Sequence, residues 1–139
     1  MQFTVGDWML DVVIFVEPDA SVAEALSLMR RRYTQSVIVN KTETNPEYGI
    51  VTSTDICDKI VAQERNPSLV KVREIMTSPL ITVFRSTPLK ECALLMKQKK
   101  IHHLPVMDDE DECPIGVISA NDFLVAAEAM GKAPGERII

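Results

Sequence analysis

Two short segments of this chain carry residue types that could seat a phosphorylated ligand. Residues 49–55 read Gly-Ile-Val-Thr-Ser-Thr-Asp, and residues 116–122 read Gly-Val-Ile-Ser-Ala-Asn-Asp. A glycine at the end of a strand lets a ligand approach the backbone closely. A helix that begins just after it presents free N–H groups and the positive end of its dipole to an anion. Both segments therefore predict a phosphate seat.

Each segment also holds a hydroxyl residue followed three positions later by an aspartate: Thr52 with Asp55, and Ser119 with Asp122. The hydroxyl could supplement the backbone donors, and the carboxylate could accept both hydroxyls of a ribose. The same residues also fit a helix-capping pattern, which stabilises the start of a helix with no ligand present. The residues alone leave both interpretations open.

The two segments are part of a tandem duplication with a constant offset of 67 residues. The same offset pairs Val5 with Val72, Met9 with Met76, Ile14 with Ile81, Val16 with Val83, Glu24 with Glu91, Met29 with Met96 and Val39 with Val106. A duplicated supersecondary unit of this size is too small to bury a core alone, so two copies are expected to pack into one globule. We assign the copies to residues 1–67 and 68–131, with a tail at 132–139.

Each copy has the pattern of a β-α-β-β-α unit, which predicts an α/β (α+β) fold. The expected strands are 12–16, 36–39 and 48–51 in the first copy and 80–83, 103–106 and 115–118 in the second. Apolar residues at helical spacing predict a first helix after residue 21 in the first copy and after residue 88 in the second. A second helix is expected to begin at Thr52 in the first copy and at Ser119 in the second. Ser21 with Glu24 predicts a capping box, and Thr87 before Pro88 predicts a helix start. A joint is expected at 66–68, where a proline interrupts the helical pattern.

Composition excludes several functional classes. The chain has 139 residues, of which 46% are apolar, and 20 acidic against 15 basic residues give a net charge of −5. This charge, without a long basic run, argues against nucleic acid as a partner. No apolar stretch has the length of a membrane span and no signal peptide is visible, so we expect a cytoplasmic protein. The three cysteines predict neither a disulfide framework nor a zinc site, and we expect them in the core.

The pattern resembles a known family. The order of elements is similar to that of tandem cystathionine-β-synthase (CBS) domains, a pair called a Bateman module. Three motifs carry the same resemblance: the lead-in Ile75-Met76-Thr77-Ser78-Pro79, the strand His103-Leu104-Pro105-Val106 and the two Gly-x-x-Ser/Thr-x-x-Asp turns. The resemblance covers residues 5–130, approximately. It implies two pseudo-twofold related repeats that pack through their sheets and often form disc-like homodimers. It also implies two clefts that bind AMP, ADP, ATP or S-adenosylmethionine as regulatory ligands, with no required cofactor.

The resemblance also implies roles for particular residues. The hydroxyl residues Thr52 and Ser119 would contact phosphate, and Asp55 and Asp122 would hold the ribose. The turn and adenine pocket would comprise Gly49, Ile50, Gly116, Val117, Ile14 and Ile81.

The copies differ where a phosphate would need neutralisation. In the second copy His102 and His103 lie at the start of the middle strand. The equivalent residues of the first copy are Gln35 and Ser36. We therefore expect unequal clefts, with the histidines on phosphate. Because neighbours on a strand point to opposite faces, at most one of them should serve a given cleft, and the other is a surface residue.

Two further features have open interpretations. Basic clusters end both first helices, at Arg30 to Arg32 and at Lys97, Lys99 and Lys100. They fit a solvated helix end, phosphate attraction or a partner interface. Trp8 fits an internal position or a dimer contact.

No catalytic triad, zinc-protease motif or Walker loop appears, so we expect no enzyme and no metal site. Three hypotheses remain. The first is a regulatory module that senses adenosine nucleotides and signals through a homodimer or an unidentified effector protein. The second is a structural interaction module without a ligand. The third is the same scaffold with another ligand, a metal ion or an oligonucleotide.

Overall fold

The computed structural model describes residues 3–131, so the tail expected at 132–139 lies outside the described residues. The chain forms two compact units. Unit 2 is continuous and spans Val12–Ile81, whereas unit 1 combines the residues up to Asp11 with those from Thr82 onward. Each unit contains a three-stranded sheet and its own hydrophobic core.

Unit 2 is built on strands β1 (Phe15–Val16), β2 (Ser36–Val39) and β3 (Gly49–Thr52). The first pair is parallel and the second antiparallel. Helix α2 (Val22–Arg31) connects the parallel strands, and α3 (Ser53–Ile56) follows β3 and continues as a π-helical turn, η1 (Cys57–Val61). Two 3-10 turns, η2 (Pro67–Leu69) and η3 (Val72–Glu74), complete the unit.

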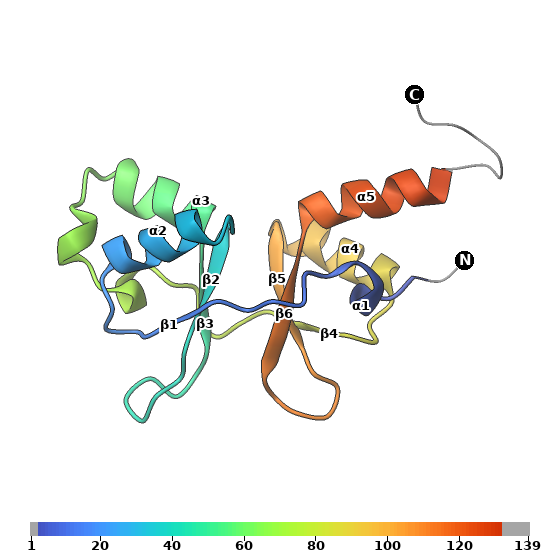
Figure 1. Cartoon of the computed structure of the whole chain (residues 1–139), viewed down its shortest axis with the longest axis horizontal. Helices are drawn as coiled ribbons and strands as arrows, with labels where there is room; N and C mark the ends of the chain where they lie inside the picture. The colour runs from blue at the N-terminus through green and yellow to red at the C-terminus, as the bar shows by residue number, and fades with distance from the viewer. Residues whose placement is uncertain (1–2, 132–139) are drawn as a thin grey trace. The chain divides into compact units, whose positions relative to one another are not determined.

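Unit 1 repeats this plan with β4 (Val83–Phe84), β5 (His103–Met107) and β6 (Pro114–Ser119), paired parallel and then antiparallel. Helix α4 (Leu89–Lys99) connects the parallel strands, and α5 (Ala120–Gly131) continues directly from β6 (Figure 1). The remaining helix, α1 (Val5–Trp8), comes from the start of the chain. The predicted β-α-β-β-α order and the α+β class are confirmed.

The two cores contain the same positions of the repeat. Every side chain in the matched set is at most 7% exposed. The pairs are Val16 with Val83, Val22 with Leu89, Ala25 with Cys92, Met29 with Met96, Val37 with Leu104, Val39 with Val106, Val51 with Ile118, and Val72 with Val5. Since full burial of an aliphatic side chain contributes about 1.5 to 3 kcal/mol, these positions supply much of the stability of each unit.

The repeats exchange their lead-in segments, which we define as residues 3–10 and 70–77. In unit 2 the N–H of Val72 donates to Ala20 O at 2.9 Å, and in unit 1 the N–H of Val5 donates to Thr87 O at 2.8 Å. These two bonds are related by the 67-residue offset. Figure 1 shows α1, in dark blue, among the yellow and orange elements of unit 1. Unit 2, formed mainly by the first sequence repeat, is therefore completed by the lead-in segment of the second repeat, and unit 1, formed mainly by the second repeat, by the lead-in segment of the first.

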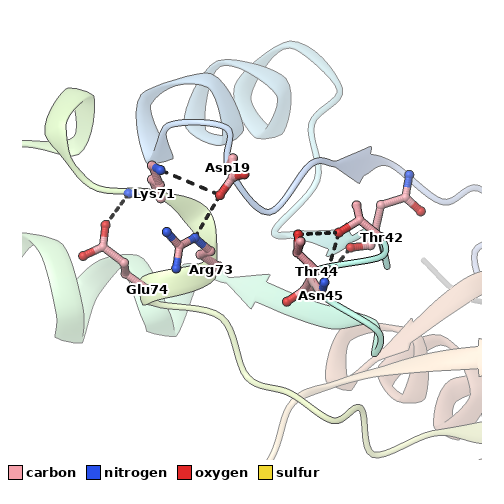
Figure 2. Close-up of polar contacts among 8 residues, drawn as sticks. Asp19, Thr42, Thr44, Asn45, Lys71, Arg73 and Glu74 are labelled. Atoms are coloured by element: carbon pink, nitrogen blue, oxygen red, sulfur yellow. Dashed lines mark hydrogen bonds and ion pairs between the residues drawn. The ribbon is translucent and has the colours of Figure 1, made fainter.

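An ion-pair cluster reinforces the lead-in segment in unit 2 (Figure 2). The Asp19 carboxylate lies 2.9 Å from Arg73 Nε and 3.8 Å from Lys71 Nζ. Glu74 accepts from the backbone N–H of Lys71 at 2.7 Å. These side chains are about half exposed, so each pair contributes at most about 1 kcal/mol. The burial of Val72 and Ile75 beside the cluster is the larger effect.

Several predicted boundaries are wrong. The first strands are shorter than expected, at Phe15–Val16 and Val83–Phe84, because the parallel partner strand pairs only with these residues. Thr87 is not the cap of α4: Pro88 occupies that position, and Thr87 Oγ1 instead accepts from the N–H of Phe84 at 3.0 Å. Ser21 caps α2 as predicted, since its Oγ accepts from the N–H of Glu24.

The cysteines also depart in part from the prediction. Cys92 is buried, and burial raises the pKa of its thiol to about 11. Cys57 and Cys113 are exposed, in the π-helical turn and in the loop before β6, respectively. The expectation that all three lie in the core is therefore wrong for these two.

Trp8 packs inside unit 1, with its ring centroid 5.2 Å from that of Phe3 in an edge-to-face arrangement. The segment expected as a joint, 66–68, forms the cap and the first two residues of η2 inside unit 2. None of the helices within residues 3–131 has the length and apolar character needed to cross a membrane. The cytoplasmic location stays a prediction.

The exchanged lead-in segments predict how fragments of the chain will fold. A fragment of residues 1–67 lacks Val70, Val72 and Ile75, whose burial contributes about 1.5 to 3 kcal/mol each. The sum is comparable with the whole stability of a small domain. We expect a fragment of residues 12–81 to unfold cooperatively on heating and the 1–67 fragment not to, as measured by circular dichroism. Equal cooperative transitions for the two fragments would contradict this assignment.

Candidate functional site

The turn between β6 and α5 brings together the predicted phosphate and ribose residues of the second repeat. The N–H of Ser119 donates to Asp122 Oδ2 at 2.8 Å, and the Ser119 hydroxyl lies 3.3 Å from the same oxygen. The other oxygen, Oδ1, has no hydrogen-bond partner among residues 3–131. Asp122 is partly exposed. Its free oxygen can accept a hydrogen bond from a ligand.

The turn between β3 and α3 forms a fuller cap. The N–H of Thr52 donates to Asp55 Oδ2 at 2.9 Å, and the N–H of Asp55 lies 3.5 Å from Thr52 Oγ1. This is a reciprocal capping box. The capping interpretation is confirmed here, and the contact of Ser119 with Asp122 follows the same pattern. Ligand contacts by these residues stay a prediction.

Asp55 differs from Asp122 in its surroundings. Its residue is only 8% exposed, and its second oxygen, Oδ1, lies 2.9 Å from Lys59 Nζ. The same ammonium group donates to Ile75 O at 2.8 Å. Sequence reasoning missed Lys59, although its position four residues after Asp55 is a spacing typical of helical ion pairs.

The two histidines have different positions. His103 is partly buried on β5, where it pairs in register with Ser119. Burial lowers the pKa of His103, the neighbouring His102 lowers it further, and Asp122 acts in the opposite direction. His102 is exposed, and its carbonyl accepts from the N–H of Ala120 at 2.9 Å. His103 therefore lies opposite Ser119 in the sheet, and His102 is the more exposed of the two. Contact of either histidine with a phosphate stays a prediction.

The expectation that a glycine ends each strand is wrong, since Gly49 begins β3 and Gly116 lies inside β6. Both glycines have a structural role that sequence reasoning missed. A Cβ atom on Gly49 would lie 2.6 Å from Met76 Sδ and 3.2 Å from Thr77 O. A Cβ atom on Gly116 would overlap the backbone oxygen of Leu10. Both glycines therefore make room for the lead-in segments, which form bridges at Ile50 with Thr77 and at Leu10 with Val117. Close approach of a ligand to these glycines stays a prediction.

The residues expected around the adenine are distributed over both units. Ile50 is 7% exposed in unit 2, where Ile14 packs against the core. Ile81 is 37% exposed and also belongs to unit 2, whereas Val117 belongs to unit 1. Their role in binding adenine stays a prediction.

A surface hollow occurs at the same place in each unit, between the end of the first helix and the start of the second. The hollow in unit 2 has a volume of about 960 Å³ and the one in unit 1 about 450 Å³. Equivalent residues line them, including Arg30 with Lys97, Gln35 with His102 and Ile56 with Phe123. The repeated basic clusters were the sequence signal for these hollows. Of the predicted site residues, His102 alone appears in their linings.

Within the described part of the chain, no group of three or more His, Cys, Asp or Glu side chains could hold a metal ion.

The comparisons with known proteins agree with this architecture. The CBS domain family matches residues 5–62 and 72–129. This chain therefore belongs to the CBS domain family and carries two copies of the domain.

Among curated relatives, an uncharacterised protein of Methanopyrus kandleri is 34% identical over 87% of this chain and 61% of its own length. The mitochondrial CBS domain-containing protein CBSX3 of Arabidopsis thaliana is 32% identical over 87% of this chain and 57% of its own length. This chain thus spans about six tenths of both relatives. Homoserine O-acetyltransferase of Methanococcus vannielii is 31% identical over 74% of this chain, but the match covers only 20% of that enzyme.

Two solved structures are similar over nearly the whole chain. A hexameric CBS-CP12 protein from bloom-forming cyanobacteria has a TM-score of 0.85 and 29% identity, covering 98% of this chain and 76% of that one. The CBS domain pair of protein MJ0100, in complex with 5′-methylthioadenosine and S-adenosyl-L-methionine, has a TM-score of 0.76 and 25% identity. That match covers 90% of this chain and 99% of the other.

The environment of His103 predicts a dependence of stability on pH. Because folding lowers the pKa of this imidazole from 6.5, the unfolded chain binds the proton more readily. Stability should therefore fall as the pH drops below about 6.5. We expect urea unfolding at pH 7.5 and 5.5 to show a smaller loss of stability for His103→Gln than for the unmodified protein. His102→Gln removes only the smaller contribution of the neighbouring imidazole, so it should reduce the loss less than His103→Gln does, and an equal effect of both changes would contradict the assignment.

Proposed function

We propose that this CBS domain pair is a regulatory module that binds an adenosine-containing small molecule, such as AMP, ADP, ATP or S-adenosylmethionine. The observation that carries the proposal is the Oδ1 oxygen of Asp122, which has no hydrogen-bond partner in the described part of the chain and lies beside a hydroxyl residue at the start of a helix. The similar CBS domain pair of protein MJ0100 is known in complex with 5′-methylthioadenosine and S-adenosyl-L-methionine. Both of those ligands carry a ribose.

Each group at the second-repeat turn has a role in this proposal. Asp122 accepts a hydrogen bond from the ribose through Oδ1, while Oδ2 continues to cap the helix. Ser119 offers its hydroxyl to a phosphate or carboxylate. The N–H of Ala120 is already bonded to His102 O, so helix α5 contributes the N–H groups that follow Ala120 in its first turn and the positive end of its dipole. His103 supplies a further donor, and an adjacent phosphate would favour its charged form.

The module acts on other molecules rather than by catalysis. The proposed output is a change in a homodimer or in a bound effector protein, triggered by the ligand. Helix α5 leaves Leu124 69% exposed and Val125 54% exposed, and such apolar side chains suit an interface. In unit 2, by contrast, Ile60 of the π-helical turn is buried in the core. Sedimentation velocity with and without nucleotide tests the dimer.

A second candidate function is a structural interaction module without a ligand. It is favoured by one observation: the capping bonds of Thr52 with Asp55, and of Ser119 with Asp122, form without a ligand. The chain also fills the space beside both glycines. The two functions differ in whether Asp122 affects nucleotide binding.

Replacement of Asp122 tests the proposed function. Asp122→Ala should weaken binding of ATP or S-adenosylmethionine by about 1.5 to 3 kcal/mol, the range for hydrogen bonds to a charged group. Isothermal titration calorimetry measures this change directly. Affinity that is unchanged in the folded variant would remove the proposed binding mode.

Loss of a helix cap must be separated from loss of a ligand contact. Asp7 offers a matched control, because its Oδ2 accepts from the N–H of Thr4 at 2.8 Å in an equivalent capping box. Asp7→Ala should cost about 0.5 to 2 kcal/mol of stability, as for other lost caps, and leave nucleotide affinity unchanged.

A further inference from the structure

The two equivalent aspartates differ in the number of hydrogen-bond sites that remain for a ligand. Asp55 uses Oδ2 for the backbone N–H of Thr52 and Oδ1 for Lys59 Nζ, at 2.9 Å in both cases. Its side chain is 11% exposed. Lys59 also donates to Ile75 O at 2.8 Å, so the ammonium group is held from two sides. Both oxygens of Asp55 are therefore engaged within unit 2.

The second repeat has no equivalent of this lysine. The offset of 67 residues relates Lys59 to Ala126, a residue that is 1% exposed and carries no charge. The Oδ1 oxygen of Asp122 has no hydrogen-bond partner among residues 3–131. The second repeat thus leaves open the carboxylate oxygen that the first repeat occupies.

The backbone explains why a lysine fits at this position in the first repeat. Cys57–Val61 forms a π-helical turn, in which Ala62 N–H donates to Cys57 O at 2.9 Å, five residues back. Such a turn accommodates one residue more than an α-helical turn. The buried position shifts accordingly, from Ala126 in unit 1 to Ile60 in unit 2, an offset of 66. Lys59 therefore avoids the core, remains 39% exposed along its side chain and reaches Asp55.

We infer that Lys59 is a specificity-determining residue that occupies Asp55 as an internal cation and restricts ribose recognition to Asp122. This inference rests on the proposed function. A carboxylate oxygen can accept more than one hydrogen bond, but the Asp55 side chain is only 11% exposed and Lys59 Nζ lies on Oδ1, so a ribose hydroxyl must compete with the ammonium group for that oxygen. The neutral hydroxyl would then replace a charge-assisted bond at a nearly buried carboxylate, which is unfavourable. The chain should therefore bind one adenosine ligand, through its second repeat.

The test is the binding stoichiometry in the full chain, measured by calorimetry with S-adenosylmethionine and, separately, with ATP. The unmodified protein should bind about one ligand per chain. Lys59→Met keeps the length of the side chain and removes its charge, so it should raise the stoichiometry to about two. Lys71→Met is the matched control, because Lys71 is also an ion-paired lysine of unit 2 but contacts Asp19. It should leave the stoichiometry at about one.

Asp55→Asn tests the inference without leaving a buried carboxylate unpaired. It should change affinity for either ligand by less than twofold, since Asp55 takes no part in binding in the unmodified protein. A tenfold loss of affinity in Asp55→Asn, or two ligands bound by the unmodified chain, would overturn the inference. So would an unchanged stoichiometry in a folded Lys59→Met variant.

Failure of the proposed function gives a different result. If neither ligand binds to the unmodified protein or to Lys59→Met, the adenosine-binding function is wrong and the inference falls with it. If the unmodified protein binds about one ligand and Lys59→Met does not gain a second, the function stands and the inference alone is wrong.

Discussion

The exchange of lead-in segments is the constraint on which both compact units depend. Residues 70–77 complete the core of unit 2, and residues 3–10 complete that of unit 1, through backbone hydrogen bonds at equivalent positions. Val72 and Val5 are fully buried at these positions. The exchange also explains the glycine inside β6, because any side chain on Gly116 would meet the backbone of residue 10. The lead-in segments thus determine the backbone of the strands that end at the proposed ligand turns.

Stability and binding use the same atoms at these turns. Oδ2 of each aspartate caps a helix, so the carboxylate is held in place before any ligand arrives. Only a second, unoccupied oxygen distinguishes a binding site from a simple cap. Asp122 retains such an oxygen, whereas Lys59 neutralises the one on Asp55. The cap is thus present in both repeats, while Lys59 and the π-helical turn make the two aspartates chemically unequal.

The repeat, the β-α-β-β-α order and the core positions could be predicted from the sequence, because apolar spacing and a constant offset reflect local structure and burial. The cap at Ser21 follows from spacing alone, and the structure confirms it. Contacts that depend on the third dimension could not be predicted in this way. The π-helical turn around Lys59 has no distinctive sequence pattern, and the role of the glycines requires knowing which segment lies beside them. Thr87 shows the same limit, since its hydroxyl bonds to Phe84 rather than to the helix that follows.

The central claim is that an adenosine ligand is recognised at the second-repeat turn and not at the equivalent turn of the first. Hydrogen–deuterium exchange measured by mass spectrometry, with and without saturating S-adenosylmethionine, tests it most directly. The account predicts slower exchange in peptides that cover residues 116–122 and unchanged exchange in those that cover 49–55. Equal protection of both turns, or protection of neither, would contradict it.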